Sequence, residues 1–315
     1  MVLRTSWVAL ASLGLVVIAV ACSSNSSPTF DGFDGGDDGS GGSSGGSSGG
    51  GDDAPSFGDD SVNPTCNVHC SADLHQVIDC NNQVKMTCPP TQGCGAGGQC
   101  VAACDAAKAN QSTIGCDYYS VDPGTDGEAN GSCFAAYIAN TWTSPVTITL
   151  EYAGKTLDAA PYSFIPTGQG ASITYAPLPN GQLPPNQLAI VFLADATAVT
   201  GPSLPTPCPA SVQAYFKTAE ASSQQTGIIN AFHLTTSAPV VAYDIFPYGG
   251  STSYISSATL LLPSSAWDTN YLPIDAWVTP NNGNGSMQPF IEVAAATDAT
   301  HVTILPKVAI VGGTG

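Results

Sequence analysis

The distribution of cysteines constrains this chain more than any other feature of its sequence. Eight of its eleven cysteines fall in a stretch of about fifty residues with little apolar content: Cys66, Cys70, Cys80, Cys88, Cys94, Cys100, Cys104 and Cys116. So short a segment cannot bury a core large enough to hold itself together without cross-links. The density therefore predicts a disulfide-stapled module in an oxidising compartment. Of the other three cysteines, Cys133 and Cys208 are expected to bond to each other.

The same cysteines leave a zinc alternative open. Cys66, His69 and Cys70 lie close together and His75 follows, but the paired short spacings of a zinc site are missing. In an exported chain such thiols would usually be oxidised first, so we favour disulfides and expect no metal. Eight cysteines allow roughly a hundred connectivities, and the sequence does not choose among them.

The first 22 residues predict export. Arg4 supplies a positive start, residues 8–21 form an uncharged and mostly apolar run, and Cys22 follows. About 14 residues span only roughly 21 Å as a helix, too short for a bilayer core of roughly 30 Å, so a cleaved signal is favoured. Ala-Val-Ala-Cys at 19–22 resembles the bacterial lipobox, which implies a lipid anchor on Cys22. The outer membrane is favoured because no Asp follows the cysteine. An ordinary secretory signal with an incidental Cys22 is the alternative.

Residues 22–65 are expected to form a disordered tether. They are mostly Ser, Gly and Asp, with an uninterrupted Gly/Ser run over 39–51. Such a composition buries too little to offset its ordering entropy. About 43 residues of this kind have a root-mean-square reach of roughly 35 to 40 Å.

Charge and motif content exclude several function classes. Six lysines and arginines against 24 acidic residues give a formal net charge of -18, so nucleic-acid binding over a basic surface is excluded. The chain has no His-Glu-x-x-His motif, no phosphate-binding loop and no glycine-rich dinucleotide motif after a strand. Only four histidines could serve as general bases. We therefore expect no enzyme, no catalytic residue and no cofactor.

Two acidic arrangements keep alternatives open. The pairs Asp244 with Asp275 and Asp117 with Asp122 could serve a glycoside hydrolase if the fold set the carboxylates at the required separation. Residues 122–128 are the best calcium candidate, although their spacing departs from that of a coordinating loop. Scattered acids on an acidic surface are the favoured interpretation of both.

From residue 117 onward the sequence predicts short strands joined by turns. Runs of β-branched and aromatic residues alternate with turn signals such as Asn180-Gly181 and Gly249-Gly250, which indicates an all-β fold class with a β-sandwich. The expected strands cover residues 134–140, 146–152, 172–175, 188–193, 228–235, 240–246, 259–262, 290–295 and 302–305. The only helical candidate is residues 209–223, where apolar side chains follow a spacing of 3, 4 and 7.

Three tryptophans invite a binding interpretation. Trp142, Trp267 and Trp277 could form a platform for stacking sugars, but core or rim packing is the commoner fate of this side chain. We favour packing and leave the binding residues unassigned.

Three ordered motifs carry a resemblance to a known family. They are GCDYYSVD at 115–122, FHLTTSAPVVAY at 232–243 and ATLLLPSSA at 258–266. Together they resemble the N-terminal domain of the IgG Fc-binding protein family, from about residue 115 to the end. The preceding cysteine-rich segment and linker resemble its myxobacterial surface versions. The resemblance implies an extracellular binding or adhesion module with no known chemistry. Fc binding itself is not carried over.

An internal repeat is expected near the C-terminal end. Residues 134–148 and 290–304 share six identities in 15 positions, including a Phe followed 12 residues later by Val-Thr-Ile. Each segment is typical of a hairpin of two β-branched strands. The second copy would open a second β module, either incomplete or lending its strands to the first sheet.

These features predict a multi-part surface protein with five segments: a signal peptide at 1–21, a tether at 22–65, a disulfide module at 66–116, a β-sandwich at 117–289 and the start of a second, incomplete β module at 290–315. We expect a bacterial outer-membrane lipoprotein whose binding or adhesion module contacts an unknown extracellular protein or glycan. A structural spacer of the cell envelope is the alternative, and a carbohydrate-active hydrolase is less favoured. A binding module should expose an aromatic or apolar patch, a hydrolase should place two carboxylates in a cleft, and a spacer should show neither.

Overall fold

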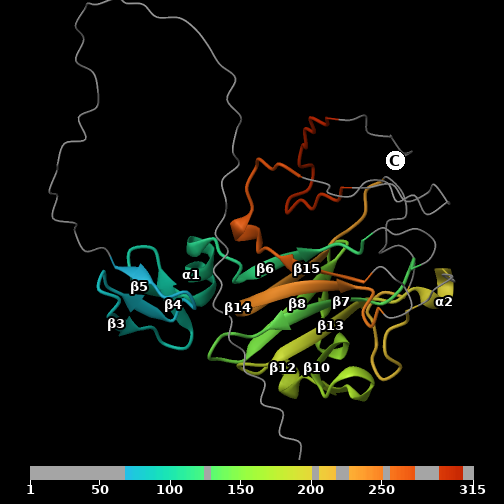
Figure 1. Ribbon diagram of the computed structural model, residues 1–315, viewed down its shortest axis with the longest axis horizontal. Helices are drawn as coiled ribbons and strands as arrows, with labels where there is room; N and C mark the ends of the chain where they lie inside the picture. The colour runs from blue at the N-terminus through green and yellow to red at the C-terminus, as the bar shows by residue number, and fades with distance from the viewer. Residues whose placement is uncertain are drawn as a thin grey trace, which may run out of the picture. The chain divides into compact units, whose positions relative to one another are not determined.

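The computed structural model describes residues 68–123, 129–200, 206–217, 227–250, 256–273 and 291–307 (Figure 1). The predicted signal peptide and tether, with Cys22 and Cys66, lie outside these residues. All the described residues belong to one compact unit, Ser61–Gly315. Within this described part, no helix is long and apolar enough to cross a membrane.

The cysteine-rich segment forms small antiparallel sheets and one helix. Its elements are β1 (His69–Cys70), β2 (Gln76–Ile78), β3 (Val84–Thr87), β4 (Gln92–Gly95), β5 (Gln99–Ala102) and α1 (Ala103–Asn110). Between pairs of described cysteines, three disulfides lie within it or tie it to the next strand: Cys70–Cys94, Cys88–Cys100 and Cys104–Cys116. Cys80 is disulfide-bonded as well. The apolar cluster at its centre is small and includes Val77 with two of the cystines, so the cross-links themselves supply part of the core.

Ten further strands form the main sheet: β6 (Gly115–Ser120), β7 (Phe134–Ala139), β8 (Val146–Tyr152), β9 (Lys155–Asp158), β10 (Ser163–Thr167), β11 (Thr174–Pro177), β12 (Gln182–Leu183), β13 (Leu188–Ala194), β14 (Phe232–Phe246) and β15 (Ser257–Leu261). In the described ranges, short helices interrupt these strands or follow them: η1 (Ala160–Tyr162), η2 (Gly170–Ser172), η3 (Pro179–Gly181), α2 (Thr197–Thr200) and η5 (Ser264–Ala266). The main path runs β11-β10-β13-β7-β14-β8-β12, and β15, β6 and β9 pair beside it. The pairings between these strands are antiparallel.

Strand β14 joins the two halves of this sheet. Its first part pairs with β6 and β8, and its second part pairs with β7 and β15 (Figure 1). The register against β6 shifts between Thr235 and Val240, and Pro239 lies in this stretch, where its missing N–H costs no ladder hydrogen bond. The strand can therefore change partners without breaking.

One apolar core lies between these strands. In β8, Val146, Ile148, Leu150 and Tyr152 are buried while Thr147 between the first two is exposed, which is the alternation of a strand with one face in a core. Buried residues of β6, β7, β8, β13 and β14 meet in the same cluster. The all-β fold class is confirmed.

Trp142 ties the cysteine-rich segment to this core. Its side chain is 1% exposed and packs in the same cluster as Leu74 and Ala103. Its indole Nε1 donates to the Pro90 carbonyl at 2.7 Å, and its ring lies 4.2 Å from that of His75. For Trp142, packing is therefore the correct interpretation.

Several predicted elements differ in the structure. The strands expected at 228–235 and 240–246 are one strand, β14, and the strand expected at 172–175 lies at Thr174–Pro177. The helix expected at 209–223 is wrong over 209–217, the part that the structure describes. There the backbone N–H groups of Tyr215 and Phe216 bond to carbonyls of β13, so sheet pairing overrides the helical spacing. The helix α1 was not expected.

The hairpin expected over 290–304 is also wrong for the residues described. Residues 291–307 contain neither strand nor helix. The apolar side chains that would form its core are about half exposed: Ile291, Val293, Val302 and Ile304. A lone two-stranded hairpin is marginal in water because it has no further strand to cover its apolar face.

Candidate functional site

A row of polar and aromatic side chains crosses the outer face of the sheet. In the register of β6, β14 and β8, Tyr119 lies opposite His233, and His233 lies opposite Glu151. Their neighbours Tyr118, Leu234 and Leu150 are fully buried in the core. Because side chains alternate along a strand, the row must face away from the core.

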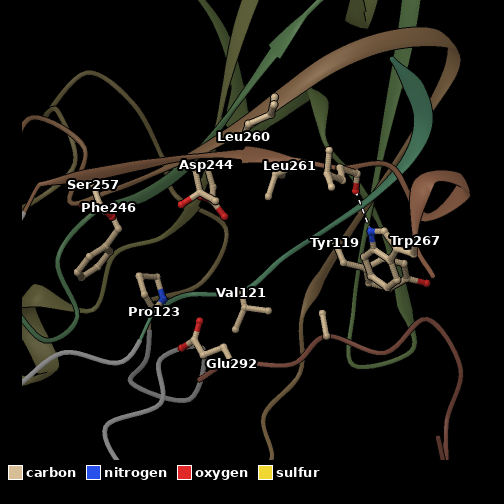
Figure 2. Close-up of a pocket in the computed structure, with 13 residues that line it drawn as sticks. Tyr119, Val121, Pro123, Asp244, Phe246, Ser257, Leu260, Leu261, Trp267 and Glu292 are labelled. Atoms are coloured by element: carbon tan, nitrogen blue, oxygen red, sulfur yellow. Dashed lines mark hydrogen bonds between the residues drawn. The ribbon is translucent and has the colours of Figure 1, made fainter. Parts of the chain in front are cut away.

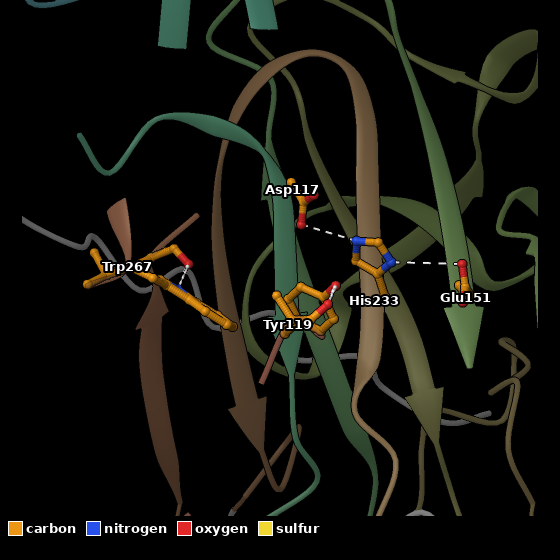
Figure 3. Close-up of polar contacts among 7 residues, drawn as sticks. Asp117, Tyr119, Glu151, His233 and Trp267 are labelled. Atoms are coloured by element: carbon orange, nitrogen blue, oxygen red, sulfur yellow. Dashed lines mark hydrogen bonds and ion pairs between the residues drawn. The ribbon is translucent and has the colours of Figure 1, made fainter. Parts of the chain in front are cut away.

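The row is held by stacking and by charge (Figure 3). The rings of Tyr119 and His233 are parallel within 5° with centroids 4.3 Å apart. His233 Nε2 lies 3.1 Å from an Asp117 oxygen, and Nδ1 lies 3.9 Å from a Glu151 oxygen. Burial, and then the charges of Asp117 and Glu151, raise the pKa of Tyr119, so its phenol keeps its proton at neutral pH. Trp267 follows at a centroid distance of 5.4 Å from Tyr119.

A pocket begins where this row ends. Its volume is about 330 Å³, and its lining includes Tyr119, Trp267, Asp244, Phe246 and Glu292. Figure 2 shows Trp267 and Tyr119 together at one end of the pocket and Phe246 at the other. The Trp267 indole is fixed by a 3.0 Å hydrogen bond from Nε1 to the Leu262 carbonyl. The size suits a small organic group, and the walls combine aromatic surface with carboxylates.

One buried carboxyl group, Asp122, lies next to lining residues in the chain, and one partly buried carboxyl group, Asp244, lines the pocket. Asp122, between the lining residues Val121 and Pro123, is 1% exposed, and its Oδ1 has no hydrogen-bond partner among the described residues. Burial, and then Glu292 and Asp244, raise the pKa of Asp122 well above its ordinary value. Burial also raises the pKa of Asp244 to about 6, although Ser120 Oγ donates to it at 3.1 Å.

The residues singled out from the sequence are only partly brought together. Asp117 faces His233 on the outer face while Asp122 is buried, so these two acids do not form the pair that a hydrolase would need. Asp275, Trp277 and residues 124–128 of the calcium candidate lie outside the described residues.

The predicted cysteines can be located more fully. Cys133 and Cys208, which the sequence analysis connected, are joined by a disulfide. Cys70 bonds to Cys94, so it is not available to the zinc arrangement with His69 and His75. No group of three or more His, Cys, Asp or Glu side chains in the described ranges could hold a metal ion.

Two features of the site were missed from the sequence. The stack of Tyr119 on His233 depends on the register of β6 against β14, and nothing local in the sequence sets that register. Asp122 meets Asp244 and Glu292, two acids that follow it by more than a hundred positions in the chain. The motif at 115–122 ends at Asp122, and the motif at 232–243 ends next to Asp244. These motifs were the only signal in the sequence that could have pointed to the two acids.

The partly buried acid Asp244 is expected to make stability depend on pH. The pKa of Asp244 is about 6 in the folded state, above the ordinary value of 3.8. The proton on Asp244 therefore stabilises the folded state below pH 4, and this stabilisation is lost as pH rises through 6. The folded and ordinary pKa values of Asp244 differ by roughly two pH units, which corresponds to about 3 kcal/mol in the free energy of unfolding once the group is fully ionised. Asp244→Asn should therefore be more stable than the unchanged chain at pH 7.5, by up to that amount, and the advantage should shrink at pH 4.5.

Urea unfolding at both pH values tests this expectation. Asp158→Asn, an exposed carboxylate in β9, is the control and should change neither value. Equal pH dependence in the unchanged chain and in Asp244→Asn would contradict the assignment.

Comparison with known proteins adds one match. No curated protein and no solved structure matches the chain. The model of a family described as IgGFc binding protein matches residues 257–315. Eight of the thirteen residues that line the pocket fall inside this match, among them Trp267 and Glu292. In this C-terminal part, as its motifs predicted, the chain resembles the IgG Fc-binding protein family.

Proposed function

We propose that this chain is a bacterial outer-membrane lipoprotein, anchored through Cys22, whose β domain binds an extracellular protein. The observation that carries the binding function is the coincidence of the family match with the pocket: the residues that match a binding-protein family also supply most of the pocket lining. The pocket exposes aromatic and apolar side chains, as a binding module should. A spacer would have no reason to keep such a surface.

The sequence supports the surface location. A lipobox-like Cys22 would place the acyl anchor at the mature N-terminus, and the Gly/Ser/Asp segment after it would let the β domain reach beyond the membrane surface. The disulfides fit an oxidising compartment. Asp117 and Asp122 do not meet, but the pocket is lined by two other carboxylates, Asp244 and Glu292, so the binding test must include glycan substrates to separate binding from glycoside hydrolysis.

Replacing the anchor cysteine tests the location. Cys22→Ser should move the protein from the membrane fraction to the detergent-free supernatant and abolish lipid labelling. The substitution removes the cysteine that would carry the acyl chains, and these chains are what would hold the protein to the membrane. Ser23→Ala, which changes the neighbouring residue but keeps the anchor cysteine, is the control. Unchanged fractionation and labelling of Cys22→Ser would contradict the anchor.

The released Cys22→Ser chain then tests the binding function. Immobilised at a defined density, it should bind one or more purified extracellular proteins saturably, and an excess of free Cys22→Ser chain should compete. Turnover of glycan substrates without saturable protein binding would favour the hydrolase. No binding across an array of extracellular proteins and glycans would favour the spacer.

A further inference from the structure

The pocket carries two acids and, among the residues that line it, no cation. Its lining includes the carboxylates of Asp244 and Glu292 but neither lysine nor arginine. Asp122, which is 1% exposed and lies between the lining residues Val121 and Pro123, is close enough for Glu292 and Asp244 to raise its pKa. Two carboxylates in the wall of a pocket, with a third acid nearby, favour a ligand that carries positive charge.

The shape of the site argues against a metal ion. A bound calcium or zinc ion needs several oxygen or nitrogen ligands converging at about 2.0 to 2.6 Å. Within the ranges that the structure describes, no three acidic, histidine or cysteine side chains are arranged to hold one. A volume of about 330 Å³ instead fits an organic group that brings its own charge.

The walls favour a planar cation on an apolar stem. Trp267 and Tyr119 provide aromatic faces at one end, which attract a guanidinium by cation–π contact and stacking. Val121 and Leu260 add apolar lining that suits a methylene chain. The carboxylates of Asp244 and Glu292 can accept hydrogen bonds from guanidinium N–H groups. A neutral sugar could stack on the same rings, but it would bring no positive charge to the two carboxylates.

We propose that this pocket binds the guanidinium group of an arginine side chain presented by a partner protein. The inference rests on the proposed binding function and names the chemistry that the site recognises. The strongly negative chain, with a formal net charge of -18, would also attract a basic partner over a longer range.

Binding should follow the ionisation of Asp244. The titratable groups facing it are Asp122, Glu292 and Tyr119, and His233 stacks on the far side of Tyr119. With a pKa of about 6, Asp244 is almost fully ionised at pH 7.5 and about one-tenth ionised at pH 5. Affinity for a cation should therefore fall about tenfold between these pH values. In Asp244→Asn this fall should disappear.

The test is a titration of the ¹⁵N-labelled Cys22→Ser chain followed by NMR. The probes are N-acetyl-arginine methylamide and N-acetyl-citrulline methylamide, which differ in charge but hardly in shape. The reporter is the indole N–H of Trp267, assigned with Trp267→Phe. We expect the arginine probe to shift this signal saturably at pH 7.5 and to bind at least tenfold more tightly than the citrulline probe. Asp244→Asn and Glu292→Gln should each weaken the arginine probe at least fivefold, and Asp298→Asn, an exposed acid in the same segment, should not.

Each other outcome overturns the inference. Equal affinity for the two probes, or no shift with either, would exclude recognition of the charge. A shift with calcium chloride but not with the arginine probe would make this a metal site, and a shift with methyl glucoside alone would make it a sugar site. If an extracellular protein binds the unchanged chain and Asp244→Asn equally well while the arginine probe fails, the pocket inference is wrong and the proposed function stands.

Discussion

Trp142→Ala is expected to lower the free energy of unfolding by about 3 to 5 kcal/mol, as for other fully buried aromatic residues. The ring fills the space between the cysteine-rich segment and the sheet so closely that a Cβ added at Gly93 would lie 3.0 Å from it. Truncation would leave a cavity there and would also leave the Pro90 carbonyl without its indole donor. The loss should be visible as a lower midpoint in urea unfolding.

Trp267→Ala is the matched control for this change. Trp267 is only partly buried, and its indole also bonds to a carbonyl, so its removal should cost about 1 kcal/mol. Similar losses for the two variants would show that Trp142 does not hold the two parts together.

Removal of the Cys133–Cys208 disulfide should have a comparable effect. The bond spans a sequence separation of 75 residues, and in the chain-entropy account a loop of that length stabilises the fold by about 4 kcal/mol. Both cysteines also pack in a second apolar cluster with Ile190 and Phe192. The variant Cys133→Ala with Cys208→Ala should therefore unfold at a markedly lower urea concentration.

The Cys88–Cys100 pair provides the comparison. It spans only 12 residues, so replacing both cysteines with alanine should cost about 3 kcal/mol in the same account. Thiol counting on the denatured, unreduced parent chain should first show that both pairs are closed. A loss below about 1 kcal/mol for the Cys133 pair would contradict a stabilising role.

The sequence predicted the parts of the fold that depend on local pattern. Strand β8 lies at the expected residues because Val146, Ile148 and Leu150 alternate with polar residues, and this pattern already specifies one buried face. Strand β13 is a continuous apolar run and was equally clear. The spacing around Tyr215 failed because tertiary pairing with β13 outweighs helical periodicity. The alanine-rich helix α1 was masked by the cysteines that surround it.

The candidate site was harder to predict because it depends on register and burial. Asp122 and Asp117 look alike in the sequence, and only the alternation along β6 and the chain after it decides that one is buried and the other is exposed beside His233. Trp142 and Trp267 likewise have similar sequence surroundings, but Trp142 is buried and Trp267 is only partly buried. A resemblance carried by motifs located the relevant part of the chain, but it could not say which side chains meet.

The disulfides have a mechanical consequence if the protein is anchored on its N-terminal side while a ligand bound at the pocket pulls on it. Tension would enter through the cysteine-rich segment and reach β6 at Cys116, which is bonded to Cys104 of α1. Chain enclosed by a covalent loop cannot lengthen, so the Cys70–Cys94, Cys88–Cys100 and Cys104–Cys116 bonds limit how far this part can stretch even after its strands separate. The load would pass with little extension to β14, the strand that touches both halves of the sheet.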